Sequence, residues 1–216
     1  VQAAQDIKKR LPGLLAITYD GALRGTHIRE LARKSRLVTV APIAARANDK
    51  GTRVEKSGRV AIYPHAREDG TQCVHTFHHL AGQLHEQRID GVGNRTLTPC
   101  DDPFIRFQDN KTDHRMYLRW DVHCAAGKAP GSKPSKVGEL AWTVTDDDST
   151  FNVAENLRAI PPGSPRYADP HGWRQTIEND NHQSDSRKVQ GRSRSARPEW
   201  NHLNELGWAL MQNGVA

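Results

Sequence analysis

The chain has 216 residues, enough for one sizeable domain or for a modest domain that carries an inserted second one. Its hydrophobic fraction of 36% and aromatic fraction of 6% are low for a fully packed globule, so we expect a thin core and substantial loop. The net charge of +6 favours an anionic partner, and the lack of any apolar run of ~18 residues excludes a membrane-spanning helix.

The cysteines and the N-terminus indicate a reducing compartment. Cys73, Cys100 and Cys124 are widely spaced and odd in number, which matches neither a disulfide framework nor a Cys-x-x-Cys metal site. No signal peptide is visible, because the first residues lead into a charged stretch. We therefore expect a cytoplasmic protein. The absent initiator Met suggests a fragment, although a processed or trimmed chain would look the same.

The first forty residues have the pattern of an α/β protein. Residues 2–10 predict a helix that Pro12-Gly13 stops. Residues 14–19 and 37–40 are apolar runs, typical of parallel strands that are buried on both faces. Between them, Thr26 is placed to cap a second helix. Helix, strand, helix and strand in this order predict an α/β fold.

The middle of the chain has a different pattern. Residues 46–145 alternate in short segments between turn clusters, which predicts an antiparallel, strand-rich insert. Residues 127–138 predict a flexible loop, and helical character returns at 170–186 and 199–213. The clearest predicted strands are Arg59–Tyr63, Leu80–Ile89, Phe104–Phe107 and Met116–Val122.

Two carboxylates stand at positions that suit catalysis. Asp20 follows a predicted buried strand, and ligands of open α/β sheets collect outside the carboxyl ends of strands. A turn Asp that accepts backbone N–H groups is the equally good alternative. Glu178 lies on one stripe of the later helix with Arg174, where the alternative is an exposed ion pair on a solvated face.

Three segments carry a family resemblance: residues 17–28 (ITYDGALRGTHI), 155–163 (ENLRAIPPG) and 203–210 (LNELGWAL). They resemble, in that order, the second-Asp region, the stretch before the catalytic Glu helix and the terminal helix of actinobacterial DDE-type insertion-sequence transposases. In the group with a β-rich insertion domain, the Glu helix carries Tyr-x2-Arg-x3-Glu-x6-Lys. This chain matches it at Arg174 and Glu178 and departs from it at His171 and Asp185.

The resemblance implies a partial RNase H-like fold interrupted by a mostly antiparallel insertion. Residues 1–45 would be the first part of the core, 46–150 the β-rich insertion domain and 151–216 the C-terminal helices of the core. The implied function is cutting and joining of transposon ends by metal-dependent phosphoryl transfer. Asp20 and Glu178 would be ligands of Mg²⁺ (or Mn²⁺), a hard cation that oxygen ligands suit.

The resemblance also implies the partners. Arg174 would position Glu178 or touch a phosphate, since its planar fork suits either role. Arg187 and Lys188 are close enough to replace the family's Lys as phosphate contacts, and Arg192 and Arg194 extend this basic stretch. A disordered loop is the alternative for these residues. The partner would be transposon-end and target DNA, and a homodimer is compatible with the family.

One carboxylate of the family's set of three has no counterpart in the predicted elements. The first Asp belongs on the first strand of the RNase H sheet, and Asp6 lies in a predicted helix instead. We therefore expect the 216 residues alone to be catalytically inactive, and the strands 14–19 and 37–40 to lack sheet neighbours and expose apolar edges. The alternative function is a non-catalytic DNA-binding remnant or regulator of transposition.

Two further clusters suggest sites but favour ordinary structure. Cys73, His75, His78, His79 and His85 invite a zinc interpretation, yet their spacing matches no strong template, and neighbouring residues of a strand point to opposite faces. Asp146-Asp147-Asp148 is typical of a solvated turn.

Overall fold

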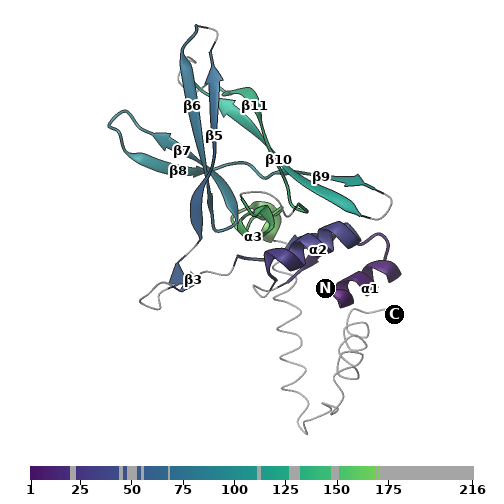
Figure 1. The fold of residues 1–216 in the computed structure, drawn as a ribbon. Coiled ribbons are helices and arrows are strands. Elements are labelled where there is room, and N and C mark those ends of the chain that lie inside the picture. The colour runs from purple at the N-terminus through teal and green to yellow at the C-terminus, as the bar shows by residue number, and fades with distance from the viewer. Residues whose placement is uncertain are drawn as a thin grey trace. The chain divides into compact units, whose positions relative to one another are not determined.

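The computed structural model describes residues 1–19, 23–43, 46–47, 53–54, 56–67, 69–110, 113–126, 132–146, 151–168 and 170. The chain divides into two units, Val1–His171 and Gly172–Ala216, and all described residues belong to the first. They combine helices with antiparallel sheets and one parallel strand pair, a mixed α/β arrangement (Figure 1). No helix in this described part is long and apolar enough to cross a membrane.

The predicted order of the first elements is confirmed. Helix α1 spans Gln2–Arg10, and β1 (Ala16–Thr18) pairs in parallel with β2 (Val38–Val40). Helix α2 (Gly25–Ser35) forms the crossover between the two strands. The Lys8 ammonium lies 2.6 Å from the carbonyl oxygens of both Pro12 and Leu14, and so fixes the turn that follows α1.

The two parallel strands differ in burial. All of β2 is buried, whereas β1 is half-buried and is flanked by Leu15 and Tyr19, which are 75% and 48% exposed. The prediction that residues 14–19 form a strand buried on both faces is therefore wrong. This strand pairs with β2, but Leu15 beside it is exposed to solvent. We expected both strands to expose apolar edges, and the exposed apolar residues flank β1, whereas β2 is buried.

Helix α2 begins two residues earlier than predicted. Arg24 is the N-cap residue, and its backbone N–H donates to His27 Nδ1 at 3.2 Å. Thr26 lies inside the first turn, so the prediction that it caps the helix is wrong. Ile28, Leu31 and Ala32 form the buried stripe of the helix, as an amphipathic pattern requires.

Antiparallel strands follow, as predicted. One sheet is the meander β5 (Ser57–Ala66), β6 (Gln72–Leu80), β7 (Gln83–Ile89) and β8 (Arg95–Pro99). A second sheet has the order β11 (Ser135–Thr143), β10 (His114–Cys124), β9 (Phe104–Asp109). The short strands β3 (Arg46–Ala47) and β4 (Arg53–Val54) pair separately.

Two predicted boundaries are corrected. The run Leu80–Ile89 is not one strand, because Ala81 and Gly82 take positive φ values of 49° and 91° and form a tight turn between β6 and β7. Two consecutive positive φ values suit a two-residue hairpin turn. The predicted loop 127–138 is too long at its end, since β11 begins at Ser135.

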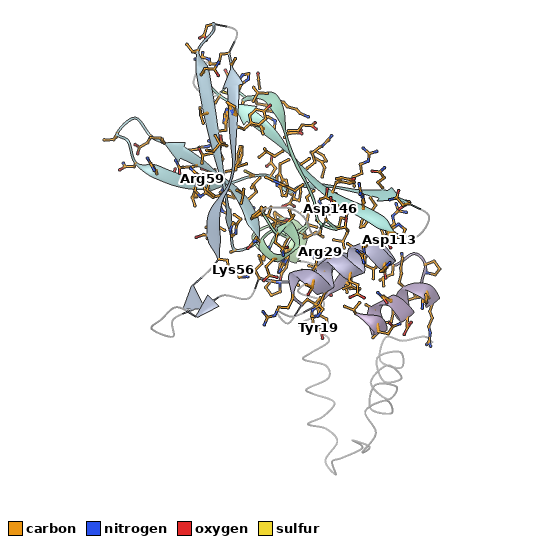
Figure 2. All side chains as sticks on the ribbon, in the orientation of Figure 1. Tyr19, Arg29, Lys56, Arg59, Asp113 and Asp146 are labelled. Atoms are coloured by element: carbon orange, nitrogen blue, oxygen red, sulfur yellow. The ribbon has the colours of Figure 1, made fainter. Side chains whose placement is uncertain are left out.

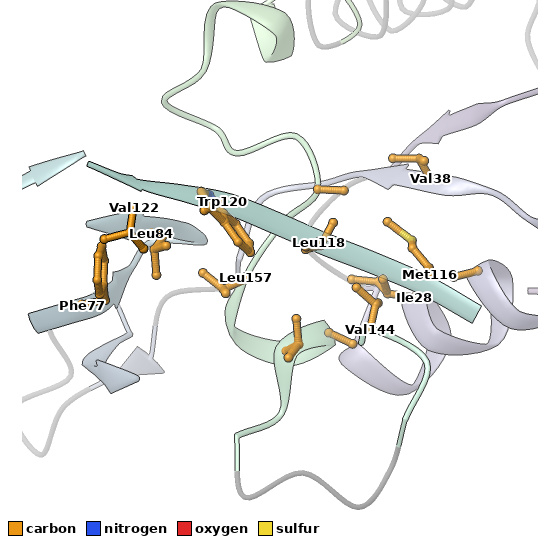
Figure 3. Packing of buried hydrophobic residues seen from close by; sticks show 14 residues of the cluster. Ile28, Val38, Phe77, Leu84, Met116, Leu118, Trp120, Val122, Val144 and Leu157 are labelled. Atoms are coloured by element: carbon orange, nitrogen blue, oxygen red, sulfur yellow. The ribbon is translucent and has the colours of Figure 1, made fainter. Parts of the chain in front are cut away.

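One hydrophobic cluster connects these elements along β10 (Figure 3). Residues of β10 alternate between buried and more exposed, the period of a strand with one face against a core. Met116 and Leu118 pack in the cluster with Ile28 of α2 and Val38 of β2. At the other end, Trp120 and Val122 join residues of the meander and of the later chain: Phe77, Leu84 and Leu157.

The last described segment returns the chain to the first elements. Helix α3 (Val153–Asn156) is capped by Asn152, whose side chain accepts from the Glu155 N–H at 3.1 Å. Leu157 then forms an isolated parallel bridge with Gly82. Residues 151–168 thus pack against both the α/β elements and the meander.

Candidate functional site

The carboxyl ends of β1 and β2 lie at one edge of their sheet, where an α/β fold places its ligands. The strands are in register, with Thr18 opposite Val40, and the Tyr19 N–H extends the ladder by donating to the Val40 carbonyl at 3.0 Å. Asp20 is the next residue and lies outside the described residues. Tyr19, the residue before it, lies at this edge (Figure 2).

Arg158 fixes the chain just after β2. Its side chain is 4% exposed, and its Nε donates to the Ala41 carbonyl at 3.0 Å. Its Nη1 donates to the carbonyls of Ala154 at 2.8 Å and Leu157 at 3.0 Å, at the end of α3. The same residue's backbone N–H donates to the Gly82 carbonyl at 2.8 Å. One side chain therefore ties the end of β2 to α3, and its backbone ties both to the β6–β7 turn.

Glu155 fixes the start of α2 in a similar way. Its Oε2 accepts from the Gly25 N–H at 2.7 Å, and its Oε1 pairs with Lys56 Nζ at 2.6 Å. A Cβ at position 25 would lie 2.8 Å from both the Glu155 backbone nitrogen and Oε2, so this close approach requires glycine. A carboxylate at the first amides of a helix is also favoured by the helix dipole.

The charges of Arg158 and Glu155 are shaped by their surroundings. Burial lowers the pKa of Arg158 to about 10, while Glu155 and Tyr167 act against this shift, so the guanidinium stays protonated at neutral pH. Burial by itself would raise the pKa of Glu155, but hydrogen bonds from Lys56 and the Gly25 N–H lower it on balance. Both groups are charged at pH 7.

The other predicted catalytic and DNA-binding residues lie outside the described residues. These are Arg174 and Glu178, together with the basic residues Arg187, Lys188, Arg192 and Arg194. Asp6 is placed as predicted, on α1, where its carboxylate accepts from the Gln2 side chain at 3.1 Å.

The histidines of β6 and β7 lie on opposite faces of their sheet. His75 and His79 point to the core side of β6, and His75 Nδ1 lies 2.6 Å from Glu86 Oε1. His78 and His85 are cross-strand neighbours on the other face. Burial, with smaller effects from Lys56 and His78, lowers the pKa of His79. Within the described ranges no group of His, Cys, Asp and Glu is arranged to hold a metal ion.

The acidic triplet is described only in part. Asp146 is exposed, which is what a solvated turn requires, and Asp147 and Asp148 lie outside the described residues. Sequence reasoning missed Lys56 altogether. It recognised residues 155–163 as part of a resemblance without giving Glu155 and Arg158 a role. The charged residues near α3 were the available signal, but Gly25 and Ala41, which they hold, are 130 and 117 residues away in sequence.

Comparison with known proteins gives no relative: no family description matches the chain, and no curated protein or solved structure is significantly similar to it.

Proposed function

We propose that this chain is the C-terminal part of a DDE-type transposase and supplies the second and third catalytic carboxylates, Asp20 and Glu178. The observation that carries the proposal is the hydrogen bond between Gly25 and Glu155. It joins two of the segments that resemble the family, residues 17–28 and 155–163, which are separated in sequence by the antiparallel strands. A split core around a β-rich insertion requires such a contact.

The strand pattern supports the same proposal. An RNase H-like core needs a parallel pair with a helical crossover, and β1, α2 and β2 have this arrangement. The edge at which Asp20 leaves β1 is also the edge where Glu155 and Arg158 hold the backbone. Further strands and the first carboxylate would come from sequence beyond these 216 residues, since Asp6 lies on α1.

The chemistry would be phosphoryl transfer at the ends of a transposon. Asp20 and Glu178 would hold Mg²⁺ (or Mn²⁺) with the first Asp, and the ions would supply positive charge to the reacting phosphate. Arg174 would orient Glu178 or contact a phosphate through its planar fork. Arg187, Lys188, Arg192 and Arg194 would bind the DNA backbone.

The test uses a chain extended by the reading frame upstream of Val1. We expect the extended protein to cleave labelled duplexes that carry the element's ends in the presence of Mg²⁺ or Mn²⁺. Asp20→Asn and Glu178→Gln should each abolish cleavage and leave duplex binding unchanged. Asp101→Asn is the matched control, because Asp101 is exposed and lies in the connection between β8 and β9. The 216-residue chain should be inactive.

Three results would contradict the proposal: cleavage that survives Asp20→Asn, cleavage by the 216-residue chain alone, or an extended chain that folds but never cleaves. An upstream frame that stops before any strand-borne Asp would favour the second candidate, a DNA-binding remnant or regulator. In that case binding to element ends should persist while every cleavage assay is negative.

A further inference from the structure

The sheet β9–β10–β11 has an outward face that the proposed function does not use. Outward positions pair across β9 and β10 as Phe104 with Arg119, Arg106 with Tyr117, and Gln108 with Arg115. The alternate residues on the other face, such as Met116 and Leu118, belong to the core. Strand geometry therefore gathers the five residues Phe104, Arg106, Arg115, Tyr117 and Arg119, here called the arginine face, on the side away from the core.

The arginine face is rich in uncompensated positive charge. Arg106 and Arg115 are exposed and form no ion pair within the described part of the chain. Arg119 lies 3.4 Å from Glu139, but both side chains are about two-fifths exposed (44% and 39%), and such surface pairs contribute little.

Two acids of the β9–β10 hairpin are engaged by α2. Asp113 pairs with Lys34 at 2.5 Å and Asp109 with Arg36 at 3.3 Å, both at the carboxyl end of α2 (Figure 2). The hydrogen bond from Lys34 lowers the pKa of Asp113, so this acid is ionised at neutral pH and committed to α2. Arg106 and Arg115 therefore keep their positive charge within the described residues, although these acids lie in the same hairpin.

Aromatic rings lie between the arginines. Phe104 is 57% exposed, and the guanidinium of Arg119 lies over its ring, 5.0 Å from the centroid. Tyr117 is half-buried between Arg115 and Arg119 along the strand and opposite Arg106. Its hydroxyl donates to Gln108 Oε1 at 3.2 Å, which holds the ring in place. An exposed Phe adds nothing to phosphate binding, but its ring offers a surface on which a flat apolar group can stack.

We propose that the arginine face binds single-stranded DNA, with phosphates on Arg106, Arg115 and Arg119 and unpaired bases stacked on Phe104 and Tyr117. Single strands expose both chemistries together, whereas a duplex hides the faces of its bases and an acidic peptide lacks them. DNA is chosen over RNA because the proposed function acts on DNA, and on this one point the inference rests on that function; the oligouridylate below tests the choice.

This binding is independent of Asp20 and Glu178, so its failure and the failure of the proposed function are separate results. The measurement is fluorescence anisotropy with a labelled oligothymidylate of about fifteen nucleotides, matched by a duplex and by an oligouridylate of the same length. Phe104→Leu should weaken single-strand binding about tenfold, because one stacking contact is lost and the charge is unchanged. The double variant Arg106→Gln/Arg115→Gln should reduce the slope of log K against log salt by about 1.4, roughly 0.7 for each phosphate contact.

The control is Arg59→Gln/Arg95→Gln. It removes the same charge from exposed positions of the other sheet and should leave affinity within about twofold (Figure 2). Thermal melts of all variants check the fold. Photocross-linking with iodo-deoxyuridine, followed by peptide mass spectrometry, should map the strand to Phe104 or Tyr117.

Four outcomes would overturn the assignment. One is affinity unchanged by Phe104→Leu, and another is an equal loss in the control. The third is tighter binding of the duplex or of the oligouridylate than of the oligothymidylate. The last is cross-links confined to the basic stretch 187–197.

Discussion

Cys100 is a partly buried thiol whose chemistry is set by its surroundings. Burial, with smaller effects from Glu86 and Asp101, raises the pKa of its thiol to about 12. Since the thiolate is the nucleophile, a thiol with this pKa is nearly unreactive at neutral pH. The spacing of the cysteines predicted the lack of a metal motif, but the reactivity of each depends on its packing and was not accessible from the sequence.

We predict that Cys100 resists alkylation in the native protein. At pH 8 its thiolate fraction is about 10⁻⁴, against roughly a quarter for an unperturbed thiol. The native protein is treated with iodoacetamide at pH 8, and the modified peptides are measured by mass spectrometry. Cys100 should react at least a hundredfold more slowly than in the protein unfolded in about 8 M urea. Equal rates in the two conditions would show that the thiol is not buried in solution.

Among the elements, helix α2 depends both on its own sequence and on contacts with distant residues. Its place between two parallel strands was predicted from residues 14–40. Its cap was not. The sequence offered Thr26, whereas the structure uses His27 and a carboxylate 130 residues away from Gly25. Helix caps that come from distant chain segments leave no trace in local spacing.

Some features of the strands were likewise predictable from the sequence, and others were not. Alternation along β5, β9 and β10 was visible because each has one face toward the core. The β6–β7 turn was missed because Ala81 adopts a positive φ that glycine or asparagine usually takes, so the apolar pattern ran through it unbroken. The carboxyl-end position of Asp20 was predicted from the strand alone, but the residues that hold this edge became apparent only from contacts.

We predict that Glu155 links the stability of α2 to pH. The pKa of Glu155 in the folded chain lies below its ordinary value of 4.5, so its stabilisation is complete above that pH and is lost as the pH falls through the folded value. Glu155→Gln should lower the free energy of unfolding by about 1–2 kcal/mol at pH 7, and the difference should shrink as the pH falls below 4.5.

Urea unfolding at a series of pH values measures this difference. Glu30→Gln is the control, because Glu30 is exposed on the same helix and forms no hydrogen bond or ion pair within the described residues. A Glu155→Gln difference that stayed constant from pH 7 to pH 3 would mean that the carboxylate charge is unimportant.

At the scale of the whole described unit, the core is continuous across the three segments that the sequence separated. Residues of α2, of β6 and β10, and of the segment after α3 belong to one cluster. The change of pattern near residue 46 was real, since antiparallel strands begin there. Alternation showed that β10 has a buried face, but it did not show that α2 and β2 cover part of that face.

We predict that Arg158→Met destabilises this unit by about 2–4 kcal/mol. The variant keeps the length of the side chain but leaves the buried carbonyls of Ala41 and Ala154 without their donor. Denaturant unfolding measures the loss, and Arg59→Met at an exposed strand position should stay within about 0.5 kcal/mol of wild type. A loss at Arg158 no larger than this control would mean that water replaces the guanidinium.

The hydrogen bonds of Glu155 and Arg158 also set an order of events during synthesis. The hairpins between Ser57 and Thr143 close through near neighbours in sequence, and such contacts form quickly. The Gly25–Glu155 and Ala41–Arg158 contacts span 130 and 117 residues, so they form only after the later partner has left the ribosome. Until then the nascent chain carries β1, β2 and α2 without their final cover, and we expect this interval to be the one in which chaperones matter most.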